Sequence, residues 1–124
     1  MSCRSIAGHA LTPGKTVKDH IHVEGTELHV PHVLLCGEKP GPTILISAGI
    51  HNAEYVGIQA AIELSSELEV SALRGSVIIV PLANRSGFEN RTMSMVYEDG
   101  KNLNRVFPGD REGSEADKLA HMLF

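Results

Sequence analysis

The chain has 124 residues, which is enough for one hydrophobic core and too few for several ordinary domains. Apolar residues make up 42% and charged residues 21% of the chain, so disordered and fibrous classes are excluded. The net charge of -4 offers no basic face that could neutralise phosphates, so nucleic acid is not expected as a partner.

The N-terminal residues 1–9 contain no continuous apolar segment of signal-peptide length. The longest apolar runs, near 44–50 and 77–80, are too short to span a bilayer, so we expect no membrane contact and a cytoplasmic location. Without export signals, Cys3 and Cys36 are expected to be reduced thiols, and we assign neither a catalytic role.

Residues 17–37 alternate apolar and polar side chains in two pieces, separated by the turn residues Glu24, Gly25 and Thr26. This pattern predicts a β-hairpin. Gly and Pro are concentrated in 37–42, which predicts a turn before the next strand.

Residues 43–49 form a short apolar run of the kind that is buried on both faces of a sheet. Apolar positions then recur at helical spacing from 54 to about 68, and a second apolar run follows at 76–81. Strand, helix and strand in this order predict a right-handed parallel unit, and therefore an α/β core with a mixed sheet and flanking helices.

Residues 82–112 have little periodicity and are rich in Asn, Arg, Gly and Asp. A connection of this length is usually functional or disordered. Residues 114–124 read as a helix, with Ser114 as its N-terminal cap.

His51 and Glu54 follow the predicted strand at 43–49, at the edge where open α/β sheets place their ligands. Residues three apart at the start of a helix point to the same side, so imidazole and carboxylate can reach one zinc ion. A catalytic zinc site needs three protein ligands and an open position, and no convincing third ligand follows these two. The alternative is a solvated His–Glu pair that caps the helix.

Arg91, Asn104 and Arg105 form a second candidate group. An arginine fork can bind a carboxylate through two parallel hydrogen bonds, and a neighbouring amide adds another donor. Asn104 and Arg105 are therefore suited to bind a carboxylate of a substrate. Arg91 would then be free to interact with a different negative charge. The alternative is that the arginines form surface ion pairs of little energetic weight with Glu89, Asp99 or Asp110.

The predicted hairpin also carries four histidines that offer a rival metal site. His20 and His22 share one strand face, and His29 and His32 lie on the partner strand. A four-histidine cluster across the hairpin is one interpretation, and a solvated polar face is the other.

Taken in chain order, these segments resemble the zinc carboxypeptidase-like deacylases, in particular the succinylglutamate desuccinylase and aspartoacylase group. The resemblance covers roughly residues 25 to 120. Its most specific element is Asn-Leu-Asn-Arg-Val-Phe-Pro-Gly at 102–109, supported by Gly49 to Glu54 and by Pro81 to Asn84 with Arg91.

The resemblance implies that His51 and Glu54 are zinc ligands, that Arg91 stabilises the oxyanion, and that Asn104 and Arg105 bind a substrate carboxylate. It implies metal-assisted hydrolysis of the amide bond of an N-acyl amino acid or a similar carboxylate-bearing small molecule. It further implies one incomplete catalytic domain over 1–124, with an N-terminal β region at 1–40 and the start of the α/β zinc hydrolase core at 41–124.

The chain departs from the family pattern in three respects. Asn52 stands where the family usually has glycine, and we expect it to preserve the turn by adopting a left-handed conformation. Asn102 stands where the family usually has aspartate, so a charge behind the metal site is absent. In relatives, the third ligand, a histidine, and the general-base glutamate come from a region downstream of these residues. His121 is expected on the surface and not at the metal. No geometric argument assigns Glu112 or Glu115 as the general base.

Two functions from different classes follow. In the first, the chain is the N-terminal part of a zinc-dependent deacylase and is inactive in isolation. In the second, it is a non-catalytic domain that binds a carboxylate ligand or a partner chain, with self-association through an open sheet edge.

Overall fold

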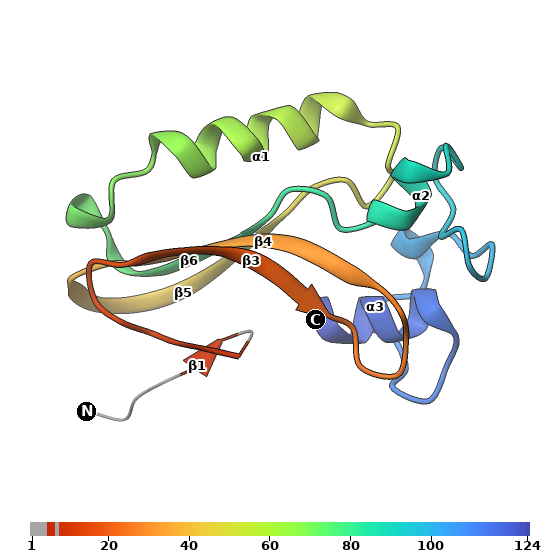
Figure 1. The fold of residues 1–124 in the computed structure, drawn as a ribbon, viewed down its shortest axis with the longest axis horizontal. Helices are drawn as coiled ribbons and strands as arrows, with labels where there is room; N and C mark the ends of the chain where they lie inside the picture. Colours follow the sequence, from red (N-terminus) through yellow and green to blue (C-terminus); the bar gives the residue numbers. More distant parts are fainter. Residues whose placement is uncertain (1–4, 7) are drawn as a thin grey trace.

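The computed structural model describes residues 5–6 and 8–124 as a mixed α/β fold, which confirms the predicted fold class (Figure 1). Cys3 lies outside the described residues. The main sheet has four strands in the order β3-β4-β6-β5, and a two-stranded sheet pairs β1 with β2. The strands are β1 (Ser5–Ile6), β2 (His9–Ala10), β3 (Thr16–His22), β4 (His29–Cys36), β5 (Lys39–Ser47) and β6 (Arg74–Val80).

The hairpin predicted from alternation is confirmed as the antiparallel pair of β3 and β4. Its turn is closed by the Val23 N–H, which donates to the Leu28 carbonyl at 2.9 Å, and by the Thr26 hydroxyl, which donates to the Val23 carbonyl at 2.7 Å. Cys36 is buried at the end of β4 and forms no disulfide with another described residue.

The predicted strand, helix and strand unit is confirmed by β5, α1 (Tyr55–Glu67) and β6, and the two strands are parallel. A short 3₁₀ turn, η1 (Val70–Ala72), leads into β6. However, β5 begins at Lys39 rather than at Thr43, because Lys39 already pairs with Arg74 before a register irregularity. The predicted turn therefore shrinks to the residues around Gly37.

The prediction that this first strand is buried on both faces is wrong. Most of β5 is exposed, including Ile44 at 51% and Leu45 at 43%. The strand order explains the difference, since β6 lies between β4 and β5 and leaves β5 with one neighbour in the described part of the chain. An apolar run alone cannot distinguish a central strand from an edge strand.

Each face of the main sheet is covered by a different helix (Figure 1). Helix α1 packs on one face, where Ala61 joins a cluster with Leu35 and Ile79. Helix α3 (Glu115–Leu123) packs on the other, where Leu119 joins a cluster with Val30. No helix in the described residues has the length and apolar character needed to cross a membrane.

The aperiodic segment 82–112 is built from short, hydrogen-bonded elements. It contains α2 (Arg85–Glu89) and the 3₁₀ turn η2 (Leu103–Arg105). Asn84 caps α2 by accepting from the Gly87 N–H at 3.2 Å, and its amide nitrogen donates to the Met95 carbonyl at 3.0 Å. Side chains rather than periodicity organise this segment, which is why the sequence pattern did not reveal the two elements.

Asp99 ties this segment to the start of α3, and its removal is expected to destabilise the fold. One carboxylate oxygen of Asp99 accepts from the Ser114 hydroxyl at 2.7 Å and from the Ala116 N–H at 2.8 Å. We expect Asp99→Ala to lower the free energy of unfolding by about 1–2 kcal/mol, because an otherwise unpaired helix N–H loses its acceptor. Urea denaturation measures the loss. The control is Asp110→Ala, whose carboxylate accepts from the exposed Glu112 N–H, and an equal loss in both variants would contradict the prediction.

Candidate functional site

The segment carrying His51 and Glu54 leaves β5 through a turn that is hydrogen-bonded to the end of β6. The Ala83 N–H donates to the Ala48 carbonyl at 2.9 Å, and the Asn84 N–H donates to the Gly49 carbonyl at 3.0 Å. Gly49 has φ of 68°, and a Cβ there would lie 2.9 Å from a Leu82 methyl, so any other residue would strain this turn. The carboxyl ends of two parallel strands therefore meet beneath the candidate ligands.

His51 lies between two oxygen atoms from distant parts of the chain. Its Nδ1 is 3.3 Å from Glu54 Oε1, and its Nε2 is 2.9 Å from Asn102 Oδ1. The His51 side chain is 28% exposed and that of Glu54 is 73% exposed. The imidazole is thus held from behind by Asn102, while the carboxylate remains open to solvent.

The proton arrangement of the His51 ring follows from a third hydrogen bond. The backbone N–H of Asn104 donates to the same Asn102 Oδ1 at 3.0 Å. A backbone N–H can only donate, so this atom of Asn102 must be the carbonyl oxygen of the amide. The neighbouring Nε2 of His51 must therefore carry a hydrogen, and in the neutral ring the lone pair belongs to Nδ1.

This lone pair of Nδ1 faces the carboxylate of Glu54. Two acceptors at 3.3 Å are favourable only with a proton or a cation between them. Imidazole nitrogen and carboxylate oxygen are both ordinary zinc ligands, so the pair fits this metal as part of a larger set. In their present side-chain positions, the described residues contain no group of three or more His, Cys, Asp or Glu that could hold a metal ion.

Asn52 does not preserve the turn in the way expected from sequence. Among the described non-glycine residues, positive φ occurs at Arg91 and Met93, and not at Asn52. Asn52 is instead 2% exposed, and its amide donates to the Thr92 hydroxyl at 2.9 Å. The left-handed expectation is wrong because the side-chain amide, rather than the backbone conformation, holds this residue to the neighbouring loop.

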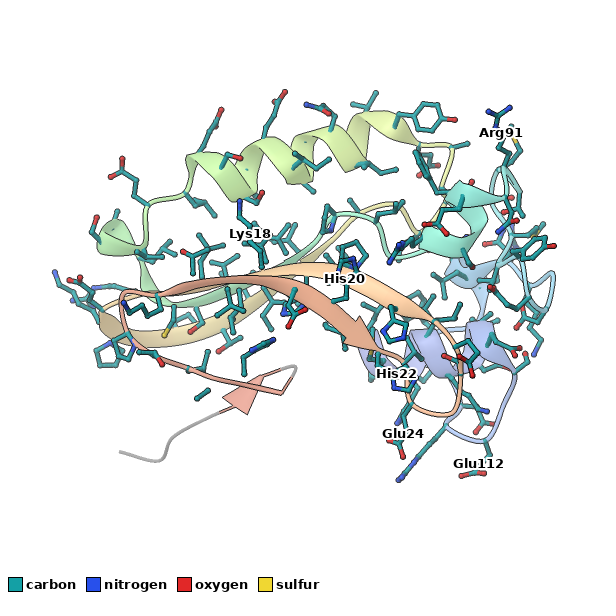
Figure 2. All side chains as sticks on the ribbon, viewed as in Figure 1. Lys18, His20, His22, Glu24, Arg91 and Glu112 are labelled. Atoms are coloured by element: carbon teal, nitrogen blue, oxygen red, sulfur yellow. The ribbon has the colours of Figure 1, made fainter. Side chains whose placement is uncertain are left out.

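Arg91 lies on that loop, after α2, with φ of 56°. Its side chain is exposed and points outward in Figure 2. Within the described residues, neither Arg91 nor Arg105 forms the surface ion pairs predicted as the alternative. Glu89 pairs with Arg85 at 2.8 Å, and the carboxylates of Asp99 and Asp110 accept hydrogen bonds from other groups. Both guanidinium groups are therefore available for a charge from outside the described chain.

Asn104 and Arg105 are exposed on η2, which is positioned by the residues on either side of Asn104. Leu103 is fully buried in the cluster beneath α3. The Asn102 side chain caps η2 and also contacts His51. A single amide thus joins the candidate metal ligands to the candidate carboxylate-binding residues.

The contact between Asn102 and His51 is the part of the site that sequence reasoning missed. In the family pattern, Asn102 differs from the usual aspartate only by the loss of a charge. Its position two residues before Asn104 also allows its side chain to accept a hydrogen bond from the Asn104 N–H and so to cap η2. His121 is exposed and lines a cavity with His22 and Glu24 at the hairpin turn. Glu112 lies at the end of the molecule opposite Arg91 (Figure 2).

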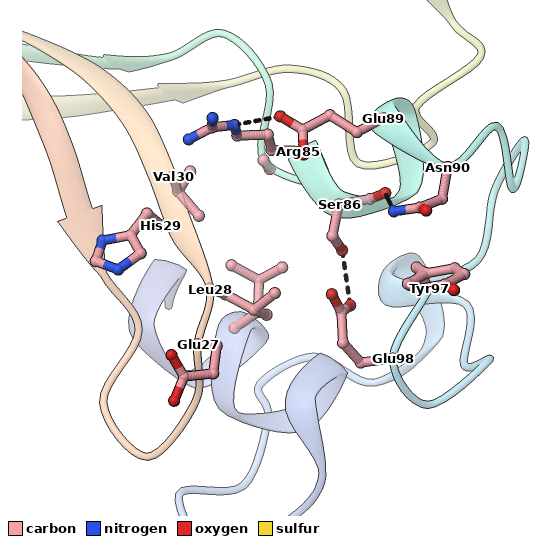
Figure 3. A pocket seen from close by; sticks show the side chains of 12 residues that line it. Glu27, Leu28, His29, Val30, Arg85, Ser86, Glu89, Asn90, Tyr97 and Glu98 are labelled. Carbon is pink, nitrogen blue, oxygen red and sulfur yellow. Dashed lines mark hydrogen bonds and ion pairs between the residues drawn. The ribbon is translucent and has the colours of Figure 1, made fainter.

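The cavity shown in Figure 3 lies between α2 and the β3–β4 hairpin and does not include the candidate site residues. Its polar groups are largely paired with one another. Arg85 binds Glu89 at 2.8 Å, and the Ser86 hydroxyl donates to Glu98 at 2.7 Å. We therefore place the candidate site at the strand ends and not in this cavity.

A mixed α/β sheet with polar side chains gathered at the carboxyl ends of its parallel strands has the ligand-binding edge of open α/β enzymes. The family model described as "Succinylglutamate desuccinylase/Aspartoacylase catalytic domain" matches residues 40–124. The chain belongs to this family, which confirms the resemblance seen in the sequence.

Individual relatives agree with this assignment. Over 82 residues the chain is 48% identical to the N-alpha-acetyl-L-2,4-diaminobutyric acid deacetylase of Halomonas elongata, covering 64% of this chain and 23% of that protein. An aspartoacylase family protein from Mesorhizobium loti is 36% identical with a TM-score of 0.77, covering 90% of this chain and 36% of that one. The product-bound ectoine utilization protein EutE (DoeB) from Ruegeria pomeroyi is 27% identical with a TM-score of 0.76 and the same coverage. The chain therefore spans between about a quarter and just over a third of the length of these relatives.

Proposed function

We propose that this chain forms part of a zinc-dependent deacylase that hydrolyses the amide bond of an N-acyl amino acid or a similar carboxylate-bearing substrate. The observation that carries the proposal is the His51 ring, whose Nε2 is bound to Asn102 while its Nδ1 faces the Glu54 carboxylate. Membership of the deacylase family supports the amide as the bond that is cleaved.

In this proposal His51 and Glu54 hold the zinc ion, which would polarise the scissile carbonyl and acidify a bound water. Asn104 and Arg105 donate hydrogen bonds to the substrate carboxylate and so orient the amide. Arg91 donates to the oxygen on which negative charge develops. A third ligand and a general base must come from outside the described residues, in which no three-ligand group occurs.

Arg91→Ala is expected to lower kcat roughly a hundredfold with little change in KM, measured in the complete enzyme. Loss of one preorganised donor to a developing oxyanion costs about 3 kcal/mol in the transition state and much less in the ground state. Arg111→Ala is the matched control, because Arg111 is an exposed arginine whose carboxylate partner is Glu24, on the hairpin turn. An effect confined to KM would exclude the oxyanion role.

Arg105→Ala is expected to show the converse pattern. Removing the fork that binds the substrate carboxylate should raise KM and reduce the preference for substrates with a carboxylate beside the scissile bond. Steady-state kinetics on an N-acetyl amino acid and on its amide-capped analogue measure this preference. An unchanged ratio between the two substrates would contradict the assignment.

The coding sequence beyond Phe124 tests whether a complete site can exist. We expect the reading frame to continue through a histidine on a buried strand and a later glutamate, and the extended protein to hydrolyse N-acyl amino acids in a zinc-dependent reaction. A stop codon after Phe124 would contradict the catalytic proposal and favour the second function below.

The exposed β5 edge favours a second candidate function, a non-catalytic domain that binds a partner chain. Ile44 and Leu45 are 51% and 43% exposed on a strand with one neighbour in the described structure. Edges of this kind offer free backbone groups for pairing. If the 124-residue chain self-associates through β5, Leu45→Lys should make it monomeric in sedimentation, whereas Lys39→Ala should not.

A further inference from the structure

His9, Asp19 and His32 come together on the face of the β3–β4 hairpin opposite α1. Asp19 and His32 are directly opposed across the two strands. His9 belongs to β2, in the segment of residues 8–15 that precedes β3 and passes under the sheet in Figure 1; we call this segment the N-terminal arm. Its Nε2 lies 3.1 Å from Asp19 Oδ2, and the rings of His9 and His32 are 5.6 Å apart between centroids.

The His32 side chain is buried, and within the described part of the chain it has no hydrogen-bond partner. The residue is 2% exposed, and neither ring nitrogen has a hydrogen-bond partner among the described residues. A buried imidazole with two unsatisfied nitrogens is unfavourable, because it loses its bonds to water without replacement. Burial, followed by the nearby His9, lowers the pKa of His32, so the ring is kept in the neutral form that binds metals.

The carboxylate beside these rings is kept ionised. The His20 backbone N–H donates to Asp19 Oδ1 at 2.8 Å, and this bond is the main cause of a lowered pKa at Asp19. The other oxygen, Oδ2, is the one that faces His9. One carboxylate and two imidazoles therefore share a small volume beneath the hairpin.

The four-histidine cluster considered from sequence does not form, because the strand alternation divides it. His29 and His32 are an odd number of residues apart, so they point to opposite faces. His22 stacks with His29 at 4.9 Å between centroids. His20 lies on the same side as α1 in Figure 2. His32 is opposed to Asp19, the residue before His20, so it points to the opposite face, where its ring lies beside that of His9.

We propose that His9, Asp19 and His32 bind a divalent transition-metal ion, at a site separate from His51 and Glu54. Two nitrogens and one carboxylate oxygen form a ligand set that suits zinc and its neighbours in the first transition row. Two imidazoles on one zinc, with bonds of about 2.0 Å and a tetrahedral angle, place their ring centres roughly 5 Å apart. The observed separation of 5.6 Å is close to this requirement.

In the side-chain positions of the structure, no three described His, Cys, Asp or Glu residues could hold a metal ion, so binding by His9, Asp19 and His32 requires the His32 ring to turn. The His32 ring can turn without breaking a hydrogen bond to any described residue, since its nitrogens have no partner there. The ion can enter from the solvent side, where the side chains of His9 and Asp19 are 29% and 53% exposed. A bound ion would connect the N-terminal arm to the main sheet.

The test is a calorimetric titration of the 124-residue chain with Zn²⁺ alone, in a His51→Ala/Glu54→Ala background that removes the other candidate ligands. We expect one saturable equivalent of zinc, and a rise in the thermal unfolding temperature when zinc is present. His9→Ala and Asp19→Asn, both at solvent-accessible side chains, are each expected to abolish the binding and the thermal shift.

The matched control is His20→Ala combined with His22→Ala, which removes two histidines from the same strand but from its other face. This control is expected to retain the equivalent of zinc and the thermal shift. The proposal is overturned if the background protein binds no zinc, if binding survives His9→Ala, or if it disappears in the His20→Ala/His22→Ala control. Circular dichroism of each variant confirms that loss of binding is not loss of fold.

Discussion

Asn102→Leu is expected to weaken zinc binding at His51 and Glu54 by about 10–100-fold. Leucine is similar in size to asparagine but cannot accept the hydrogen bond from His51 Nε2, which is 2.9 Å long in the structure. Without this acceptor the ring can turn, and the proton can move to Nδ1, the nitrogen that faces Glu54. Competition with a chromophoric chelator, in a His9→Ala background that removes the other proposed site, measures the affinity.

Asn102→Asp is the matched variant, because aspartate keeps an oxygen acceptor at the same place and adds a negative charge. We expect it to bind zinc at least as tightly as the parent chain, since a carboxylate strengthens the donor behind a metal-binding histidine. In the parent chain, the ¹⁵N chemical shifts of zinc-bound His51 should identify Nδ1 as the ligating nitrogen. If Asn102→Leu keeps both the affinity and these shifts, Asn102 does not orient the ring.

Gly75→Ala is expected to destabilise the chain by about 4 kcal/mol or more, which is a large share of the stability of a small domain. Gly75 lies in β6, beside the register irregularity between β5 and β6, with φ of 82°. A Cβ there would collide with the Pro42 carbonyl oxygen and would lie 2.6 Å from the Gly41 carbonyl carbon. Backbone cannot move aside as a flexible side chain can, so the two parallel strands would have to separate.

Gly100→Ala separates the steric collision from the backbone strain. Gly100 has φ of 71°, and a Cβ there would meet nothing within 4 Å. This variant should therefore lose only about 1–2 kcal/mol, the usual penalty of alanine in a left-handed conformation. Urea denaturation of both proteins, with the parent chain as reference, gives the difference. An equal loss of unfolding free energy in the two variants would show that the close contact between the strands at Gly75 does not add to the cost of the substitution.

The elements that were predicted correctly are those whose signal is local. Alternation over 17–37 predicted the hairpin, and helical spacing after Glu54 predicted α1, because both patterns report one buried face of one element. The exposure of β5 was not predictable in this way. Burial of a strand depends on how many neighbours it has, and that number is a property of the whole sheet.

The candidate site divides in the same manner. His51 and Glu54 are close because one turn just before α1 joins them, with the Glu54 N–H donating to the His51 carbonyl at 3.1 Å, and Asn104 and Arg105 are close because they share one turn. Each pair was therefore visible in the sequence. Asn102, which contacts both pairs, was not visible in this way. It is 51 residues from His51, and the two meet only when the segment that carries η2 lies beside the turn that follows β5.

The sequence by itself determined the hairpin, the strand, helix and strand unit, the family and the residue types available for chemistry, because period and motif depend on neighbours along the chain. Only the tertiary structure decided which of those residues meet. It placed Asn102 behind His51, separated His29 from His32 on opposite faces of one strand, and brought His9 under the hairpin beside Asp19. Such contacts depend on packing between distant segments, and a single sequence contains no direct record of that packing.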